Sequence, residues 1–282
     1  MTSMTRRSAA RRPAAPVRQI SIGRLVRVEL LKLTTARLSY GLLAASVGIT
    51  VLWNVLEASR AGKANGPAPL NTYAGLQSIV TGGVWGLIFA AVLGVIIASG
   101  EFRHLTATLT YLTEPARGRV LAAKMAAAAA GGAVFGLAGY AVACAVGLSF
   151  AASHGYGIVV GGATFADWGV GHMVGGALLA AIGVVVGSLV RSQLAGVIGV
   201  FVWSIILESL LGGLFKAVRP YLPYTAATTL SGTPLGSGSF GPGRGAVSGA
   251  PLPFAAATAL LAVIALAGAL LAARTTLRRD IT

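Results

Sequence analysis

Acidic residues are scarce in this sequence: seven Asp and Glu stand against 22 Lys and Arg, which gives a formal net charge of +15. Charged residues of both signs make up only 10% of the 282 residues, whereas a soluble domain carries about 25%. In a soluble protein, this basic excess would suggest a nucleic-acid partner. Here the basic residues gather at the ends of apolar runs, so they indicate membrane topology and anionic lipid, and we expect no nucleic-acid partner.

The sequence also lacks the usual motifs of nucleotide, metal and nucleophile sites. Its one cysteine, Cys144, lies in an apolar run, which excludes an internal disulfide and a cysteine metal cluster. None of the four lysines belongs to a Gly-x-x-x-x-Gly-Lys-[Ser/Thr] sequence, so the chain has no P-loop for ATP. Neither His-Glu-x-x-His nor Gly-x-Ser-x-Gly occurs. We therefore expect no catalysis, no cofactor and no metal on this chain.

One grouping of residues offers an alternative to the expected absence of a metal. His154 and His172 lie near the ends of the third and fourth apolar runs, and Asp167 lies between them in sequence. Imidazole and carboxylate groups are metal ligands, but these three have no regular spacing. We keep the absence of a metal as the prediction.

Long apolar runs take the place of charge, since 55% of the residues are hydrophobic and the mean hydropathy is +0.79. A helix of about 20 apolar residues crosses the ~30 Å hydrocarbon core of a membrane. We predict an all-α, polytopic membrane protein with a six-span domain over residues 38–282. The predicted spans are Leu38–Leu56, Ile79–Ser99, Val120–Phe150, Val170–Val190, Leu194–Phe215 and Pro253–Ala273.

Basic residues are divided unequally between the two sides that these spans define. The N-terminal segment, the second and fourth connections and the C-terminal tail hold 17 of the 22 Lys and Arg. Because Lys and Arg favour the cytoplasmic side, we predict that both termini are cytoplasmic. The longest connection on the opposite side, residues 216–252, holds seven glycines and five prolines and is predicted to be a flexible outer loop.

The chain before the first span divides into two predicted segments. Residues 1–20 are rich in arginine, and no apolar run with a cleavage site follows at once, so we expect a retained, disordered basic tail. In residues 21–37, apolar side chains recur at helical spacing and basic ones occupy other directions. This pattern favours a helix that lies in the inner membrane interface, and the alternative is a bent continuation of the first span.

The connection of residues 100–119 combines acidic and basic residues and is predicted to face the cytoplasm. Leu105, Leu109 and Leu112 fall at i, i+4 and i+7 before Pro115 ends the pattern. The spacing predicts a short amphipathic helix that needs a partner surface to cover its leucines. The alternative is a helix that lies flat on the lipid and only turns the chain.

Residues 100–124, GEFRHLTATLTYLTEPARGRVLAAK, resemble the cytoplasmic loop of permease subunits of type-2 ABC exporters. The matching positions are Gly100, Glu101, Arg103, Thr106, Leu109, Pro115, Arg117, Ala123 and Lys124. Leu105 departs from the pattern, because the family usually has glycine there. The stretch VELLKLTTARLSYGLL resembles the family's N-terminal elbow helix, and RPYLPYTAATTL resembles its outer segment before the last span.

The resemblance implies a multi-pass permease subunit of an ATP-driven exporter in a bacterial inner membrane. It implies a second permease subunit, in a homo- or heterodimer, and two separate ABC ATPase subunits that hold ATP and Mg. The residues that would couple the permease to the ATPases are Glu101, Arg103, Thr106, Leu109, Leu112, Pro115 and Arg117. Two other functions stay open: a membrane assembly or regulatory protein without transport, and a membrane-embedded enzyme.

One carboxylate, Glu208, lies well inside a predicted span. At ~1.5 Å per residue, its position 13 residues beyond Ala195 places it ~20 Å from the inner boundary. A charge at that depth needs protein or water around it. A structural carboxyl near the outer interface, a span that ends early near Glu208, and a group that lines the translocation path are all compatible with this position.

Four pairs of glycines four residues apart occur in three of the apolar runs. They are Gly82/Gly86, Gly132/Gly136, Gly171/Gly175 and Gly183/Gly187. Small residues at this spacing let helix backbones approach closely inside a membrane. We expect close helix packing at these positions.

Overall fold

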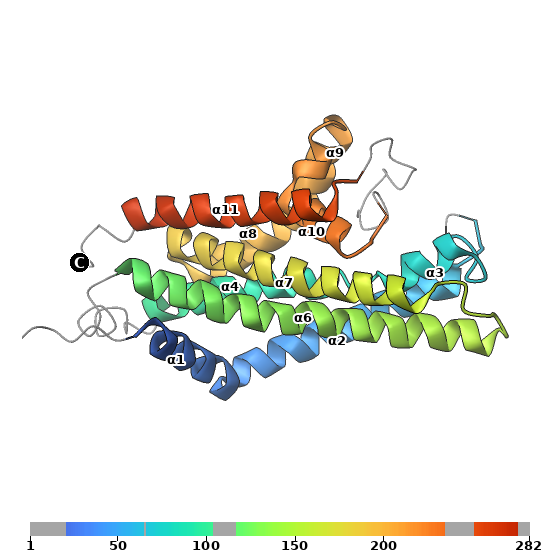
Figure 1. Ribbon diagram of the computed structural model, residues 1–282, viewed down its shortest axis with the longest axis horizontal. Helices are drawn as coiled ribbons and strands as arrows, with labels where there is room; N and C mark the ends of the chain where they lie inside the picture. Colours follow the sequence, from blue (N-terminus) through green and yellow to red (C-terminus); the bar gives the residue numbers. More distant parts are fainter. Residues whose placement is uncertain (1–20, 65, 104–116, 235–250, 276–282) are drawn as a thin grey trace, which may run out of the picture.

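The computed structural model describes residues 21–64, 66–103, 117–234 and 251–275, which form helices, turns and connections and contain no strand (Figure 1). In this part of the chain, six helical segments are long and apolar enough to cross a membrane. These findings confirm the predicted all-α class and the number of predicted spans. The tail of residues 1–20 lies outside the described residues.

The helices follow the predicted order, with longer ends than hydropathy indicated. The elements are α1 (Ile22–Thr35), α2 (Arg37–Arg60), α3 (Tyr73–Val80), α4 (Trp85–Arg103), α6 (Arg117–Ser153), α7 (Gly162–Val190), α8 (Gln193–Phe201), the π-helix η1 (Val202–Leu207), α9 (Glu208–Leu214), the 3-10 turn η2 (Arg219–Tyr221), α10 (Pro223–Leu230) and α11 (Phe254–Arg274). The fourth span begins at Gly162 instead of Val170 because its polar first turns belong to the same helix.

The long helices run side by side along the longest axis of the molecule, and α4 lies at the centre (Figure 1). Its side chains Leu87, Ile88 and Val95 are almost completely buried against α6 and α7. The outer helices α2 and α11 expose many large apolar side chains, as lipid-facing helices do. We call the end of the bundle that holds α1 and the start of α6 the α1 end, and the opposite end the α3 end.

Glycines allow the central helices to touch backbone to backbone. A Cβ atom at Gly132 would overlap the carbonyl oxygen of Gly176, and one at Gly136 would overlap that of His172. The same holds between α4 and α7, where a Cβ at Gly183 would overlap the carbonyl oxygen of Ala91. The predicted close packing at these glycines is confirmed.

The second span is interrupted, although the sequence predicted an unbroken helix over Ile79–Ser99. Helix α3 ends at Val80 and α4 begins at Trp85, with a turn of residues 81–84 between them. Adjacent glycines in this turn favour the break, because glycine has a low helix propensity. The side-chain amide of Asn54 on α2 donates to the Gly82 carbonyl at 3.3 Å and so supplies one of the lost hydrogen bonds.

Part of the predicted flexible outer loop, residues 216–252, is ordered helix. It contains η2 and α10, and the first residue of α10 is Pro223, whose fixed φ suits the first turn of a helix. The prediction of an irregular loop over that part was wrong. Residues 235–250 lie outside the described residues.

Candidate functional site

A buried ion-pair cluster joins α1 to the start of α6 at the α1 end. The Lys124 ammonium on α6 donates to Oε2 of Glu29 on α1 at 3.2 Å, and Lys32 donates to Oε1 at 2.7 Å. Glu29 is only 6% exposed and Lys124 only 4%, whereas the Lys32 side chain is 49% exposed. One carboxylate therefore holds one buried cation and one cation that reaches the surface.

The end of α4 contributes the third wall of this cluster. The Lys124 ammonium also lies 3.5 Å from the carbonyl oxygen of Ile97, at the limit of a hydrogen bond. The cluster thus brings together α1 and the two helices, α4 and α6, that flank the predicted coupling connection. A shift of α1 against these helices would separate charges that are shielded from water, which is costly.

The local sequence fixes how α1 meets the bundle. Glu29 is the one buried residue of α1, and Leu33, one turn later, packs on the same core as α4. Ala36 takes an extended conformation with φ −78° and ψ 116°, so the chain changes direction before α2. The Tyr40 hydroxyl donates to the Thr34 carbonyl at 2.7 Å and satisfies one of the free carbonyls at the end of α1.

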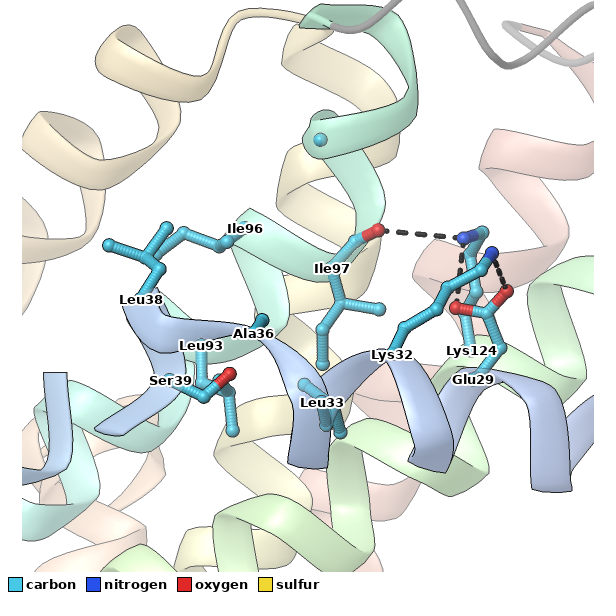
Figure 2. Close-up of a pocket in the computed structure, with 11 residues that line it drawn as sticks. Glu29, Lys32, Leu33, Ala36, Leu38, Ser39, Leu93, Ile96, Ile97 and Lys124 are labelled. Carbon is cyan, nitrogen blue, oxygen red and sulfur yellow. Dashed lines mark hydrogen bonds and ion pairs between the residues drawn. The ribbon is translucent and has the colours of Figure 1, made fainter. Parts of the chain in front are cut away.

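A cavity of about 220 Å³ lies beside the cluster, between α1, the start of α2 and α4. Figure 2 shows the charged side chains Glu29, Lys32 and Lys124 together on one side, and Leu38 and Ile96 on the other. The remaining lining residues are Leu33, Ala36, Ser39, Leu93, Ile97 and Gly100. The cavity is therefore mainly apolar and has its charge at one side.

Most of the predicted coupling residues cannot be placed. Thr106, Leu109, Leu112 and Pro115 lie outside the described residues. Glu101 and Arg103 form the last turn of α4, and Arg117 is the first residue of α6, but their side chains also lie outside the described part. The coupling helix stays a prediction, and its flanking helices α4 and α6 meet α1 at the ion-pair cluster.

Glu208 holds a helix in place at the other side of the bundle. Its Oε1 accepts from the Trp203 indole at 2.8 Å and from the Tyr224 amide at 2.7 Å. Its Oε2 accepts from the Thr225 amide at 2.8 Å and from the Thr225 hydroxyl at 3.0 Å. The carboxylate thus caps the first turn of α10, where free amides and the helix dipole favour an anion.

This arrangement supports a structural role of Glu208. Glu208 is only 3% exposed, and four donors bind its two side-chain oxygens. An ionised carboxylate can accept all four of these hydrogen bonds. The neighbouring Tyr224 hydroxyl lies 3.4 Å from the carbonyl of Val84 and links α10 to the turn before α4. Burial raises the pKa of this phenol, so its hydroxyl keeps its proton. A role of Glu208 in a translocation path remains a hypothesis.

The two histidines do not join in a metal site. His172 is completely buried, its Nδ1 donates to the Trp168 carbonyl at 2.9 Å, and its ring packs on Tyr140 at 4.9 Å between centroids. His154 is exposed and its Nδ1 lies 2.8 Å from the Phe150 carbonyl. Among the residues that the structure describes, no three His, Cys, Asp or Glu side chains gather as metal ligands would.

Reasoning from the sequence missed Glu29, although one signal was present. Glu29 is the one acidic residue in the basic segment 21–37, and it occupies a helical position near Leu25 and Leu33. An acidic side chain among the apolar residues of an amphipathic helix needs a buried cation. The loop pattern includes Lys124 only as its last position and does not link it to Glu29.

No family model matches this sequence, and no curated protein matches it significantly.

Proposed function

We propose that this chain is the transmembrane permease subunit of an ATP-driven ABC exporter. It forms the substrate path with a second permease subunit and couples to two separate ATPase subunits through the connection between spans two and three. ATP and Mg belong to the ATPase subunits, so this chain is not itself an enzyme. The proposal includes a bacterial inner membrane and cytoplasmic termini.

The observation that carries the proposal is the pattern of residues 100–124 together with the contact that its last residue makes. Lys124 is buried and binds Glu29, so the pattern ends where α1, α4 and α6 meet. A coupling helix in this connection would be attached to two spans and braced by α1. A movement of the coupling helix would then be transmitted to the spans of the bundle and would not be absorbed by a flexible connection.

The same end of the chain supports the assignment of α1 as the elbow helix. It carries three basic residues, Arg24, Arg27 and Lys32, and its apolar side chains Ile22 and Leu31 are 50% and 53% exposed. Basic and apolar side chains together on one exposed helix suit the membrane interface. The excess of basic residues on this side supports a cytoplasmic orientation.

The test is co-purification of the tagged chain with a separately encoded ATPase, using the double variant Leu109→Asp/Leu112→Asp. Burial of the leucines in an ATPase groove predicts loss of association, since removing a buried leucine side chain costs ~2–5 kcal/mol and a charge costs at least as much. The amount of chain in the membrane should not change.

The matched control is Ala107→Asp/Thr110→Asp, because at 100° per residue these positions point away from the leucines on the same predicted helix. The control should keep the ATPase bound. If both double variants retain the ATPase equally, coupling through this helix is refuted. If the unmodified chain itself retains no ATPase, the result favours a membrane assembly protein.

A further inference from the structure

The cavity beside the ion-pair cluster has the chemistry of a lipid site. We propose that it binds one anionic glycerophospholipid, with an acyl chain between α1, α2 and α4 and the phosphate beside Lys32. This proposal requires only that the chain lies in a membrane and does not depend on transport. It assigns a discrete bound lipid, which differs from the diffuse attraction of basic residues to a charged surface.

The apolar walls identify the hydrocarbon part of the ligand. The cavity of about 220 Å³ is several times the ~30 Å³ that a water molecule occupies in the liquid, and its walls include Leu33, Leu93 and Ile97. Leu38 at its rim is 52% exposed, so the apolar wall continues onto the outer surface of the bundle. Apolar walls bind water poorly, and in a membrane the hydrocarbon available to fill such a space is an acyl chain.

The charges identify the head group. Residues 21–37 contain four basic residues and one acidic residue, and that acidic residue, Glu29, is already bound by two ammonium groups. Lys32 is the half-exposed member of the cluster and lines the cavity (Figure 2). A basic pocket between membrane helices is a known kind of site for anionic head groups.

The cluster also fixes the orientation of the bound lipid. Lys124 lies deeper than Lys32, since it is 4% exposed, and it contacts the buried oxygen of Glu29. A phosphate would therefore meet Lys32 first, at the surface, with its acyl chain directed toward Leu33 and Leu38. A neutral lipid would have no comparable attraction to Lys32.

The experiment is native mass spectrometry of the full chain in detergent, after exchange into dioleoyl phosphatidylglycerol or dioleoyl phosphatidylcholine. We expect one phosphatidylglycerol to stay bound per chain under activation that removes phosphatidylcholine. Lys32→Gln should raise the Kd for phosphatidylglycerol, measured by lipid titration, about fivefold, as expected when one basic contact near a lipid surface is lost. Ala36→Phe, which fills the cavity, should remove the bound lipid without changing the charge.

The control Arg24→Gln removes an equal charge from α1 at an exposed position outside the cavity. It should keep the bound phosphatidylglycerol. Equal losses for Arg24→Gln and Lys32→Gln would overturn the proposal in favour of diffuse attraction. Equal retention of phosphatidylcholine, or retention of lipid by a folded Ala36→Phe chain, would overturn it as well.

Discussion

The ion pair between Glu29 and Lys124 allows a sharp test of how α1 is held. Replacing Glu29 with Gln removes the carboxylate from two cations but preserves the size of the side chain. The two cations differ in one decisive respect: Lys124 is 4% exposed, whereas the Lys32 side chain is 49% exposed. Lys32 can turn to water when its partner is lost, and Lys124 cannot.

The burial of each partner sets the expected magnitude. Removing one partner of a buried ion pair costs ~3–5 kcal/mol, because the other charge stays in the interior. Loss of a surface pair costs about 0–1 kcal/mol. Glu29→Gln should therefore destabilise the protein by roughly 3–5 kcal/mol, and Lys32→Gln by at most about 1 kcal/mol. The double variant Glu29→Leu/Lys124→Met should be close to neutral, since apolar pairs of similar volume often replace buried ion pairs without loss.

The assay is thermal unfolding of each purified variant in one detergent at one scan rate, because unfolding of a membrane protein is often irreversible. At about 2 °C per kcal/mol for a chain of this size, Glu29→Gln should lower the midpoint by roughly 6–10 °C. Lys32→Gln should lower it by no more than about 2 °C. If Glu29→Gln and Lys32→Gln shift the midpoint equally, or if the double variant is as unstable as Glu29→Gln, the reasoning from burial is refuted.

Three further predictions concern packing, capping and orientation. Gly132→Ala should lower the free energy of unfolding by ~1–3 kcal/mol, because its Cβ would overlap the Gly176 carbonyl. Gly48→Ala, whose Cβ meets nothing within 4 Å, should leave it unchanged. Equal unfolding midpoints of the two variants would contradict the close contact. Glu208→Gln should destabilise by ~1–3 kcal/mol because an amide has only one oxygen for the donors around it, so a midpoint equal to that of the unmodified chain would exclude the cap. In a Cys144→Ala background, an impermeant maleimide added to intact cells should label Ser153→Cys and leave Thr275→Cys unlabelled, and the reverse pattern would invert the proposed topology.

Hydropathy was sufficient to predict the number and order of the spans, because each apolar run is long enough to cross a membrane. It could not predict the break at residues 81–84, since Thr, Gly and Val leave the hydropathy of the second span high. The π-helical turn of Val202–Leu207 was hidden for the same reason. The break depends in part on a neighbouring helix, because the Asn54 amide on α2 reaches the Gly82 carbonyl.

Contacts between distant residues were beyond the reach of local pattern. Glu29 and Lys124 are 95 residues apart, and only the packing of α1 against α6 brings them together. Helix α10 was hidden in a segment rich in glycine and proline, although Pro223 at its first position is a typical helix start. The pairs Gly132/Gly136, Gly171/Gly175 and Gly183/Gly187 were predicted correctly because helix spacing alone places both glycines of a pair on one face, whereas Gly82 lies in the turn that interrupts the second span.

The buried carboxylates show how a chain with few acidic residues uses them. Of its seven Asp and Glu, Glu29 and Glu208 are the ones buried in the described part of the chain. Each fixes a short helix to the long bundle: Glu29 attaches α1 through two ammonium groups, and Glu208 attaches α10 through backbone amides and side chains. Apolar contacts are not directional, so on their own they would let a short helix slide or rotate on the apolar surface of the bundle. A buried carboxylate with directed donors permits one position, so these two residues are where a change of charge should move a helix instead of merely weakening the core.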